Sequence, residues 1–110
     1  MSASVDAKMD INEFYKDVRG DIGKLLNSVN EAAIYNDSGK EVTFYVYNYS
    51  DGVHWIPACD VKVAPGYFGS VAASGTVFKI DPDNNKDNEF LVAPEKGYVF
   101  KGPGKVEKVN

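Results

Sequence analysis

The stretch VTFYVYNYSDGVHWIPA, residues 42–58, decides the fold class. Its first six residues are β-branched or aromatic, and such residues favour strands. The Asp51-Gly52 pair that follows predicts a tight turn, and residues 53–57 predict a second, interrupted strand. Pro57 suits a sheet edge or a bulge, because proline has no N–H to donate. The stretch therefore predicts two strands joined by a turn.

Alternation assigns the side chains of the first strand to two faces, because successive residues point to opposite sides of a sheet. The expected core face carries Val42, Phe44, Val46 and Asn48. The opposite face carries Thr43, Tyr45, Tyr47 and Tyr49. Each tyrosine ring has roughly 150–250 Å² of surface to bury. We therefore expect the predicted N-terminal helix or a second subunit to cover the tyrosine face. The alternatives are a platform for carbohydrate and an anchor at a membrane interface.

Short segments of the same kind continue toward the C-terminus, separated by turns rich in glycine, proline, asparagine and aspartate. We predict further strands at residues 60–63, 67–73, 76–80, 90–92, 98–100 and 106–109. Strands of this length at spacings near ten residues are typical of antiparallel sandwiches and barrels. Residues 41–109 are therefore predicted to form an antiparallel β-sandwich.

Residues 9–33 have a helical period instead, and we predict one amphipathic α-helix there, after a flexible N-terminus at residues 1–8. Asp10 and Glu13 form a capping pair at its start, and the turn formers at residues 36–39 follow it. An apolar stripe with heptad spacing comprises Ile11, Tyr15, Val18, Ile22, Leu25 and Val29. The chain is thus expected to be one mainly β domain with an N-terminal helix.

Two glycines make this helix dependent on a partner surface. Gly20 and Gly23 each cost about 1 kcal/mol relative to alanine. The stripe can lie on a sheet face of its own chain, or two chains can bury stripes and tyrosines mutually. We predict a homo-oligomer, most simply a dimer, in which the stripe carries self-association.

Composition excludes several classes of partner. The 110 residues have a net charge of −4, and their lysines and arginines are scattered. Nucleic acid and anionic membranes are therefore not expected as partners, since both require clustered cations. A single cysteine, no signal peptide and no apolar run of about 20 residues predict a soluble, cytoplasmic protein.

No catalytic constellation is recognisable. His54 is the only histidine and Cys59 the only cysteine, and no nucleophile elbow motif is present. Cys59 is expected to be a small buried side chain. We therefore expect a protein that is not an enzyme and has no cofactor.

The polar segment at residues 81–89 is the strongest metal candidate. Its alternating oxygens resemble the first half of a calcium loop of the EF-hand type. Lys86 and Val92 replace the glycine and the bidentate glutamate of that pattern. We predict an exposed hairpin loop, with a weak calcium candidate made of Asp81, Asp83, Asn85 and Asp87.

The leading functional hypothesis is a non-enzymatic, self-associating or partner-binding β-sandwich that uses the stripe and the tyrosine-rich strand. The first alternative is a small lectin-like module that binds carbohydrate through Tyr45, Tyr47, Tyr49, Asp51, His54 and Trp55. The second is a membrane-active protein with a detachable helix, since a helix before a compact β-sandwich resembles the layout of actinoporin-type pore formers and fungal immunomodulatory proteins. Six acids against four bases between Asp6 and Glu31 make a membrane partner the less favoured one.

Overall fold

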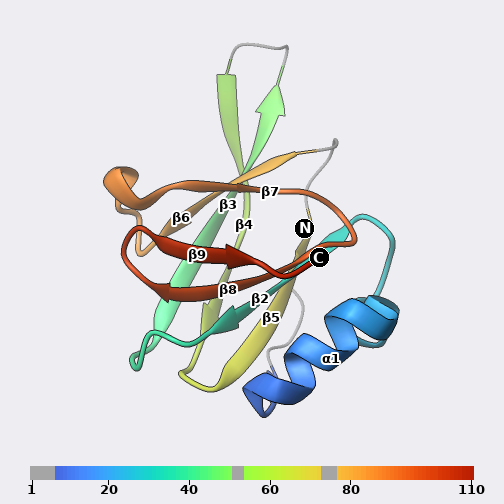
Figure 1. Ribbon diagram of the computed structural model, residues 1–110. Coiled ribbons are helices and arrows are strands. Elements are labelled where there is room, and N and C mark those ends of the chain that lie inside the picture. Colours follow the sequence, from blue (N-terminus) through green and yellow to red (C-terminus); the bar gives the residue numbers. More distant parts are fainter. Residues whose placement is uncertain (1–6, 51–53, 73–76) are drawn as a thin grey trace.

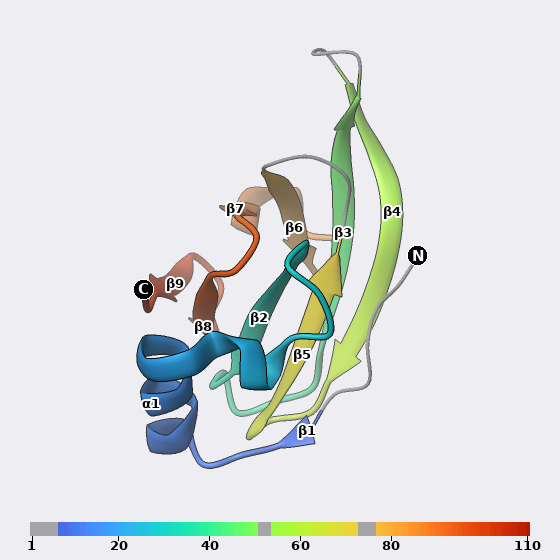
Figure 2. The same cartoon turned by 90° about the vertical axis from the view of Figure 1, so that its right-hand side faces the viewer.

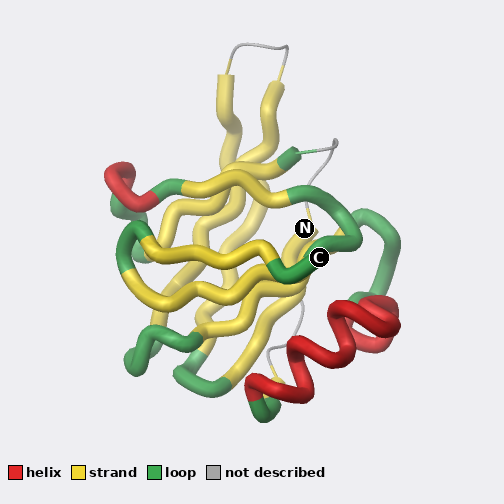
Figure 3. The backbone as a smooth tube through the Cα atoms, in the orientation of Figure 1, coloured by secondary structure: helices red, strands yellow, loops and turns green. Residues whose placement is uncertain are grey.

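The structure, a computed structural model, describes residues 7–50, 54–72 and 77–110. Two sheets pack face to face, and one helical segment near the N-terminus covers the outer face of one of them (Figures 1 and 2). Strands make up most of the path of the backbone (Figure 3). The prediction of a mainly β fold, with packed antiparallel-rich sheets and one N-terminal helix, is confirmed.

The first sheet has five strands in the order β1-β5-β2-β8-β9. All neighbours are antiparallel except β2 and β8, which run parallel. Its strands are β1 (Ala7–Lys8), β2 (Glu31–Asn36), β5 (Tyr67–Ala72), β8 (Gly97–Gly102) and β9 (Lys105–Lys108). Residues 7–8, which the sequence placed in a flexible N-terminus, therefore pair with β5 as an edge strand.

The second sheet has four antiparallel strands in the order β4-β3-β6-β7. Its strands are β3 (Val42–Ser50), β4 (His54–Val63), β6 (Phe78–Pro82) and β7 (Phe90–Val92). Residues 54–57 and 60–63, predicted as parts of two segments, belong to one strand, β4. Its register against β3 shifts between Val46 and Tyr47, opposite Cys59 and Pro57. Pro57 thus lies at an irregularity of an edge strand, as predicted.

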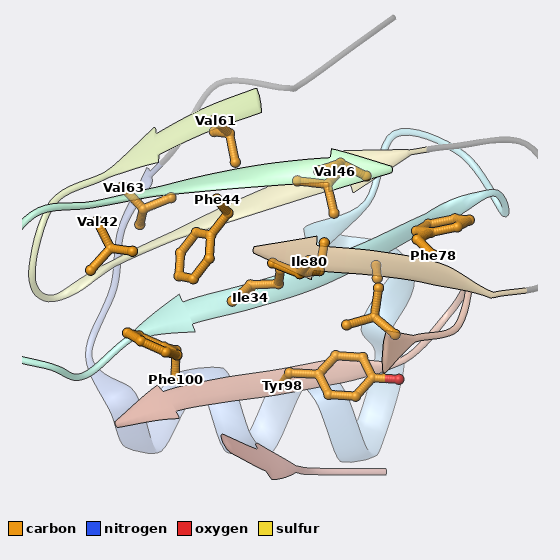
Figure 4. Packing of buried hydrophobic residues seen from close by; sticks show 13 residues of the cluster. Ile34, Val42, Phe44, Val46, Val61, Val63, Phe78, Ile80, Tyr98 and Phe100 are labelled. Carbon is orange, nitrogen blue, oxygen red and sulfur yellow. The ribbon is translucent and has the colours of Figure 1, made fainter. Parts of the chain in front are cut away.

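The core lies between the two sheets, and Figure 4 shows its side chains pointing toward one another. Val42, Phe44 and Val46 are buried, which confirms the alternation predicted for β3. The Phe44 ring meets the Phe100 ring edge to face, with centroids 5.3 Å apart. The predicted turn at residues 51–52 lies outside the described residues, as do residues 73 and 76, the facing ends of two predicted strands.

The helix is shorter than the sequence predicts, because residues 26–30 form a loop and residues 31–33 begin a strand. The α-helix α1 spans Ile11–Asp21, and a 3₁₀ helix, η1, continues over Ile22–Leu25. Residues Glu31–Asn36 form β2, and all six are buried. A strand covered on both faces has a continuous apolar sequence, so its pattern resembles the end of a buried helix.

Residues 36–39, predicted to turn the chain after the helix, instead connect β2 of the first sheet to β3 of the second. The first of them, Asn36, is fully buried, and its Nδ2 donates to Lys40 O at 2.7 Å and to Val63 O at 2.8 Å. Asn36 Oδ1 accepts from Ser38 N at 3.0 Å. One asparagine side chain therefore joins β2, the turn and the end of β4.

Candidate binding surfaces

The helical stripe lies on the chain's own five-stranded sheet. Phe14 and Val18 are buried, and the Phe14 ring centroid lies 5.2 Å from Tyr35 and 5.9 Å from Phe68. The cluster under α1 and η1 comprises Phe14, Val18, Leu25, Ala33, Tyr35, Phe68 and Val99, with Ile11, Tyr15 and Ile22 packed at its margin. Figure 2 shows α1 on the side of this sheet that faces away from β3 and β4.

Two sequence inferences about the stripe are corrected by this packing. Val29 is beyond the helix and 67% exposed, so it is not part of the buried stripe. The helix covers the five-stranded sheet and not the tyrosine face, because its apolar partners are on β2, β5 and β8. Self-association through the stripe remains a prediction. The reason first given for it, a stripe without a partner surface, no longer holds, because the chain's own sheet buries the stripe.

Polar contacts also join the helix to β9. The Tyr15 hydroxyl donates to Glu107 Oε1, and the Lys101 ammonium lies 3.2 Å from the same carboxylate oxygen. The hydrogen bond to Glu107 raises the pKa of Tyr15 to about 12, with a further contribution from burial. The same bond lowers the pKa of Glu107. A detachable helix would have to break this contact and expose Phe14.

The tyrosine face is the outer face of the four-stranded sheet. In the register of the sheet, Tyr45 lies between Asp60 and Asp81, and Tyr47 lies between Pro57 and Lys79. Tyr45 and Tyr47 are half-buried, whereas Tyr49 is 52% exposed. No helix covers this face within the described ranges.

Two aromatic side chains pair at the far end of this face. The ring centroids of Tyr49 and Trp55 lie 4.7 Å apart, with the planes tilted by 37°. These residues are on β3 and β4 where the two strands pair only with each other, since pairing of β3 with β6 ends at Asn48. Figures 1 and 2 show β3 and β4 extending past the neighbouring strands at this end. We call Tyr49, Trp55 and Ile56 the arm.

A lysine covers the rings at the base of the arm. Lys79 Nζ lies 4.8 Å from the ring centroid of Tyr47 and 5.4 Å from that of Trp55. It also lies 3.3 Å from Glu89 Oε2. A cation over an aromatic ring is attracted by the ring's quadrupole. The faces of Tyr47 and Trp55 are therefore partly occupied by a group of the same chain.

A buried acid lies at the other end of the tyrosine face. Asp81 is 2% exposed, and its Oδ1 has no hydrogen-bond partner among the described residues. Burial, together with a hydrogen bond to Glu89, raises the pKa of Asp81 to about 6. Sequence reasoning named Asp81 as a calcium candidate but missed its burial, because it assigned the residue to a polar loop. The available signal was the alternation of polar Lys79 and Asp81 with apolar Phe78 and Ile80, which extends the strand to Asp81.

The calcium candidate is dispersed in the structure. Asp81 is in β6, and Asp83 Oδ1 accepts from Thr43 N at 2.9 Å. Asn85 Oδ1 accepts from Asp87 N at 3.0 Å and caps the 3₁₀ helix η2 (Lys86–Asn88). Across residues 7–50, 54–72 and 77–110, no three histidine, cysteine, aspartate or glutamate side chains form a group suited to a metal ion. The side-chain oxygens of Asp83 and Asn85, two of the four candidate residues, thus already accept hydrogen bonds from the backbone.

The structure brings together only part of the predicted ligand set. Tyr47, Tyr49 and Trp55 are neighbours, Tyr45 lies toward Asp81, and Asp51 lies outside the described residues. His54 is exposed opposite Ser50. Cys59 is half-buried rather than fully buried, and burial raises the pKa of its thiol. A raised thiol pKa disfavours the nucleophilic thiolate.

An apolar cleft that the sequence did not reveal opens between β7 and β9, the edge strands of the two sheets. Its volume is about 380 Å³. It is lined by Val77, Phe90, Leu91, Val92, Ala93, Tyr98, Val106 and Lys108. Segments far apart in the sequence form it, so only the pairing of the strands reveals it.

Neither a scan against protein-family models nor a search of the curated proteins finds a match to this chain. None of the helices in the described part of the chain combines the length and the apolar character that crossing a bilayer requires. Function is therefore inferred from the exposed surfaces.

Proposed function

We propose that the protein is a non-enzymatic, self-associating β-sandwich and that the arm carries the association. The observation behind this proposal is the exposure of large apolar side chains at one projecting end. Tyr49 is 52% exposed and Ile56 is 47% exposed, and Trp55 lies between them along the hairpin. Aromatic anchors of this kind are enriched at protein interfaces.

The arm presents apolar surface on both of its faces. Tyr49 pairs with Trp55, whereas Ile56 pairs with Asn48, one residue earlier on β3. Because side chains alternate along a strand, Ile56 points to the opposite face from Tyr49 and Trp55. The strand β4 is also an edge strand, whose outer backbone groups can pair with another strand. These features suit a two-fold dimer in which each arm contacts the other chain.

Sedimentation equilibrium at up to high micromolar concentration tests this proposal. The wild type is expected to form dimers, and Tyr49→Ser combined with Ile56→Ser is expected to be monomeric. Val29→Ser is the matched control, because Val29 is an exposed apolar side chain outside the arm. Dimers that persist in the arm variant, or that are lost in the control, would contradict the proposal.

Carbohydrate binding is a second candidate, and the neighbouring rings of Tyr49 and Trp55 favour it. The exposed Tyr49 ring can receive a sugar face, and Lys79 and Glu89 supply polar groups nearby. Lys79 over the faces of Tyr47 and Trp55 makes this the weaker candidate. A glycan array decides between the two: a signal that is lost in folded Trp55→Ala favours carbohydrate, and no signal favours association.

A further inference from the structure

The cleft lies between β7 and β9, the edge strands of the two sheets. In Figure 1 these two strands run one above the other at the front of the molecule. The inner walls are Phe90 and Val92 from one sheet and Tyr98 and Val106 from the other. Leu91 on the rim is 57% exposed.

One charged side chain faces this apolar space. Lys108 pairs with Tyr98 across the β8–β9 ladder, and Val106 pairs with Phe100. Paired residues of neighbouring strands share a face, so Lys108 belongs to the inner, apolar face of its sheet. Lys108 is the only charged residue that lines the cleft, and it has no ion pair within the described part of the chain. An unpaired ammonium beside an apolar wall attracts an anion that also has an apolar part.

A second polar group lies on the cleft wall. The Tyr98 hydroxyl accepts a hydrogen bond from Ala93 N at 2.9 Å. A hydroxyl has one proton to donate as well, and this proton can be donated to an oxygen of a ligand. An anionic head group would thus meet Lys108 and could also accept from Tyr98.

We propose that the cleft binds a small amphiphile with an apolar chain and one carboxylate. The chain lies between Phe90, Val92 and Val106, and the carboxylate meets the Lys108 ammonium. The volume of 380 Å³ is near the lower end of the range of about 300–1,000 Å³ for small-molecule pockets. This size suits a medium-chain carboxylate better than a long lipid. The site shares no residue with the arm.

Octanoate is the probe, and octanol and octylamine are matched ligands with the same chain. Each is titrated into the full chain below its micellar concentration and followed by calorimetry and by amide chemical shifts. The variant Lys108→Met removes the charge and keeps the stem. Lys105→Met is its control, because Lys105 is an exposed lysine of the same strand that does not line the cleft.

Octanoate is expected to bind the wild type and Lys105→Met equally, with shifts at Val92, Ala93 and Tyr98. Lys108→Met is expected to weaken binding by at least about tenfold, as the loss of a charge-assisted hydrogen bond implies. Equal affinity for octanol and octanoate, or no loss in Lys108→Met, would overturn the proposal. So would the absence of binding to folded wild type at millimolar octanoate.

A second copy of the chain is the rival occupant of the cleft. Sedimentation of the wild type with and without octanoate tests this alternative. Dissociation of dimers by octanoate would assign the cleft to the interface and overturn the proposal. Unchanged association, together with unchanged octanoate affinity in the Tyr49→Ser, Ile56→Ser variant, would support a separate ligand site.

Discussion

Gly97 lies directly beneath Val18, so that a Cβ at position 97 would come within 2.5 Å of Val18 Cγ2. This contact joins the first residue of β8 to the buried face of α1. The helix therefore packs so closely on the sheet at position 97 that any side chain larger than that of glycine would displace Val18 or the helix.

Gly97→Ala is expected to destabilise the protein by about 1–3 kcal/mol, because the added methyl group must displace Val18 or the helix. Urea unfolding measures this loss. Gly20→Ala is the control, because a Cβ at that exposed helical position meets nothing within 4 Å. It should instead stabilise by about 0.5–1 kcal/mol. A smaller cost of Gly97→Ala in a Val18→Ala background would confirm the contact, and an equal cost would contradict it.

Tyr15→Phe is expected to cost about 1 kcal/mol, since it removes the hydrogen bond to Glu107 at a partly exposed site. The wild-type stability from this bond persists below the ordinary tyrosine pKa of 10 and is lost as pH rises toward about 12. Urea midpoints of the two proteins at neutral pH provide the measurement. Tyr67→Phe is the control, and an equal loss in both variants would argue against a specific bond from Tyr15.

Asp81 is expected to make the wild type lose stability as pH rises from about 4 to about 6. Its pKa increases from 3.8 to about 6 on folding, so the native state holds a proton that the unfolded state has released across this range. The stability that Asp81 contributes is fully present below pH 3.8. It is lost as pH rises through about 6, the pKa of Asp81 in the folded state. The hydrogen bond with Glu89 and its charge contribute to the raised pKa of Asp81, whereas the charges of Lys79 and Lys86 lower that pKa.

Asp81→Asn removes this titration, and denaturant unfolding at pH 4, 5, 6 and 7 measures its effect. The stability of the wild type minus that of the variant should fall as pH rises. Asp60→Asn, at an exposed position across Tyr45, is the matched control. A difference that grows with pH would show that Asp81 is stabilised as a carboxylate.

Calcium is expected to leave the melting temperature unchanged, because Asp83 and Asn85 already use their oxygens within the turn. A ligand present at 100 times its dissociation constant adds about 2.7 kcal/mol to stability, so binding would be easy to detect. Melting is compared in EDTA and in millimolar calcium. A rise of several degrees that disappears in Asp83→Asn would establish a metal site in this loop.

The sequence predicts the second half of this fold well because its local signals and its packing agree. Alternation in β3 identified Val42, Phe44 and Val46 as core residues, and the absence of an N–H placed Pro57 at an edge irregularity. The prediction was wrong for β2, because a strand that is buried on both faces lacks the alternation of apolar and polar residues. Its parallel pairing with β8 depends on residues more than 60 positions away.

The candidate surfaces could be predicted only in part. The tyrosine ladder was visible as a pattern, but the cover that Lys79 gives to Tyr47 depends on the pairing of β3 with β6. The position of Lys108 beside an apolar cleft likewise requires the arrangement of both sheets. Patterns in one strand reveal which face a residue occupies, and only the sheet order reveals its neighbours.

Trp55 is the only tryptophan of the chain and lies within the arm, so its fluorescence tests the central claim most directly. Emission spectra are recorded from nanomolar to high micromolar protein, alongside sedimentation of the same samples. If the arm carries association, the emission maximum shifts to shorter wavelength over the concentration range in which dimers form, because Trp55 leaves water. Dimers that form without any change in Trp55 emission, or a wild type that stays monomeric, would contradict the account.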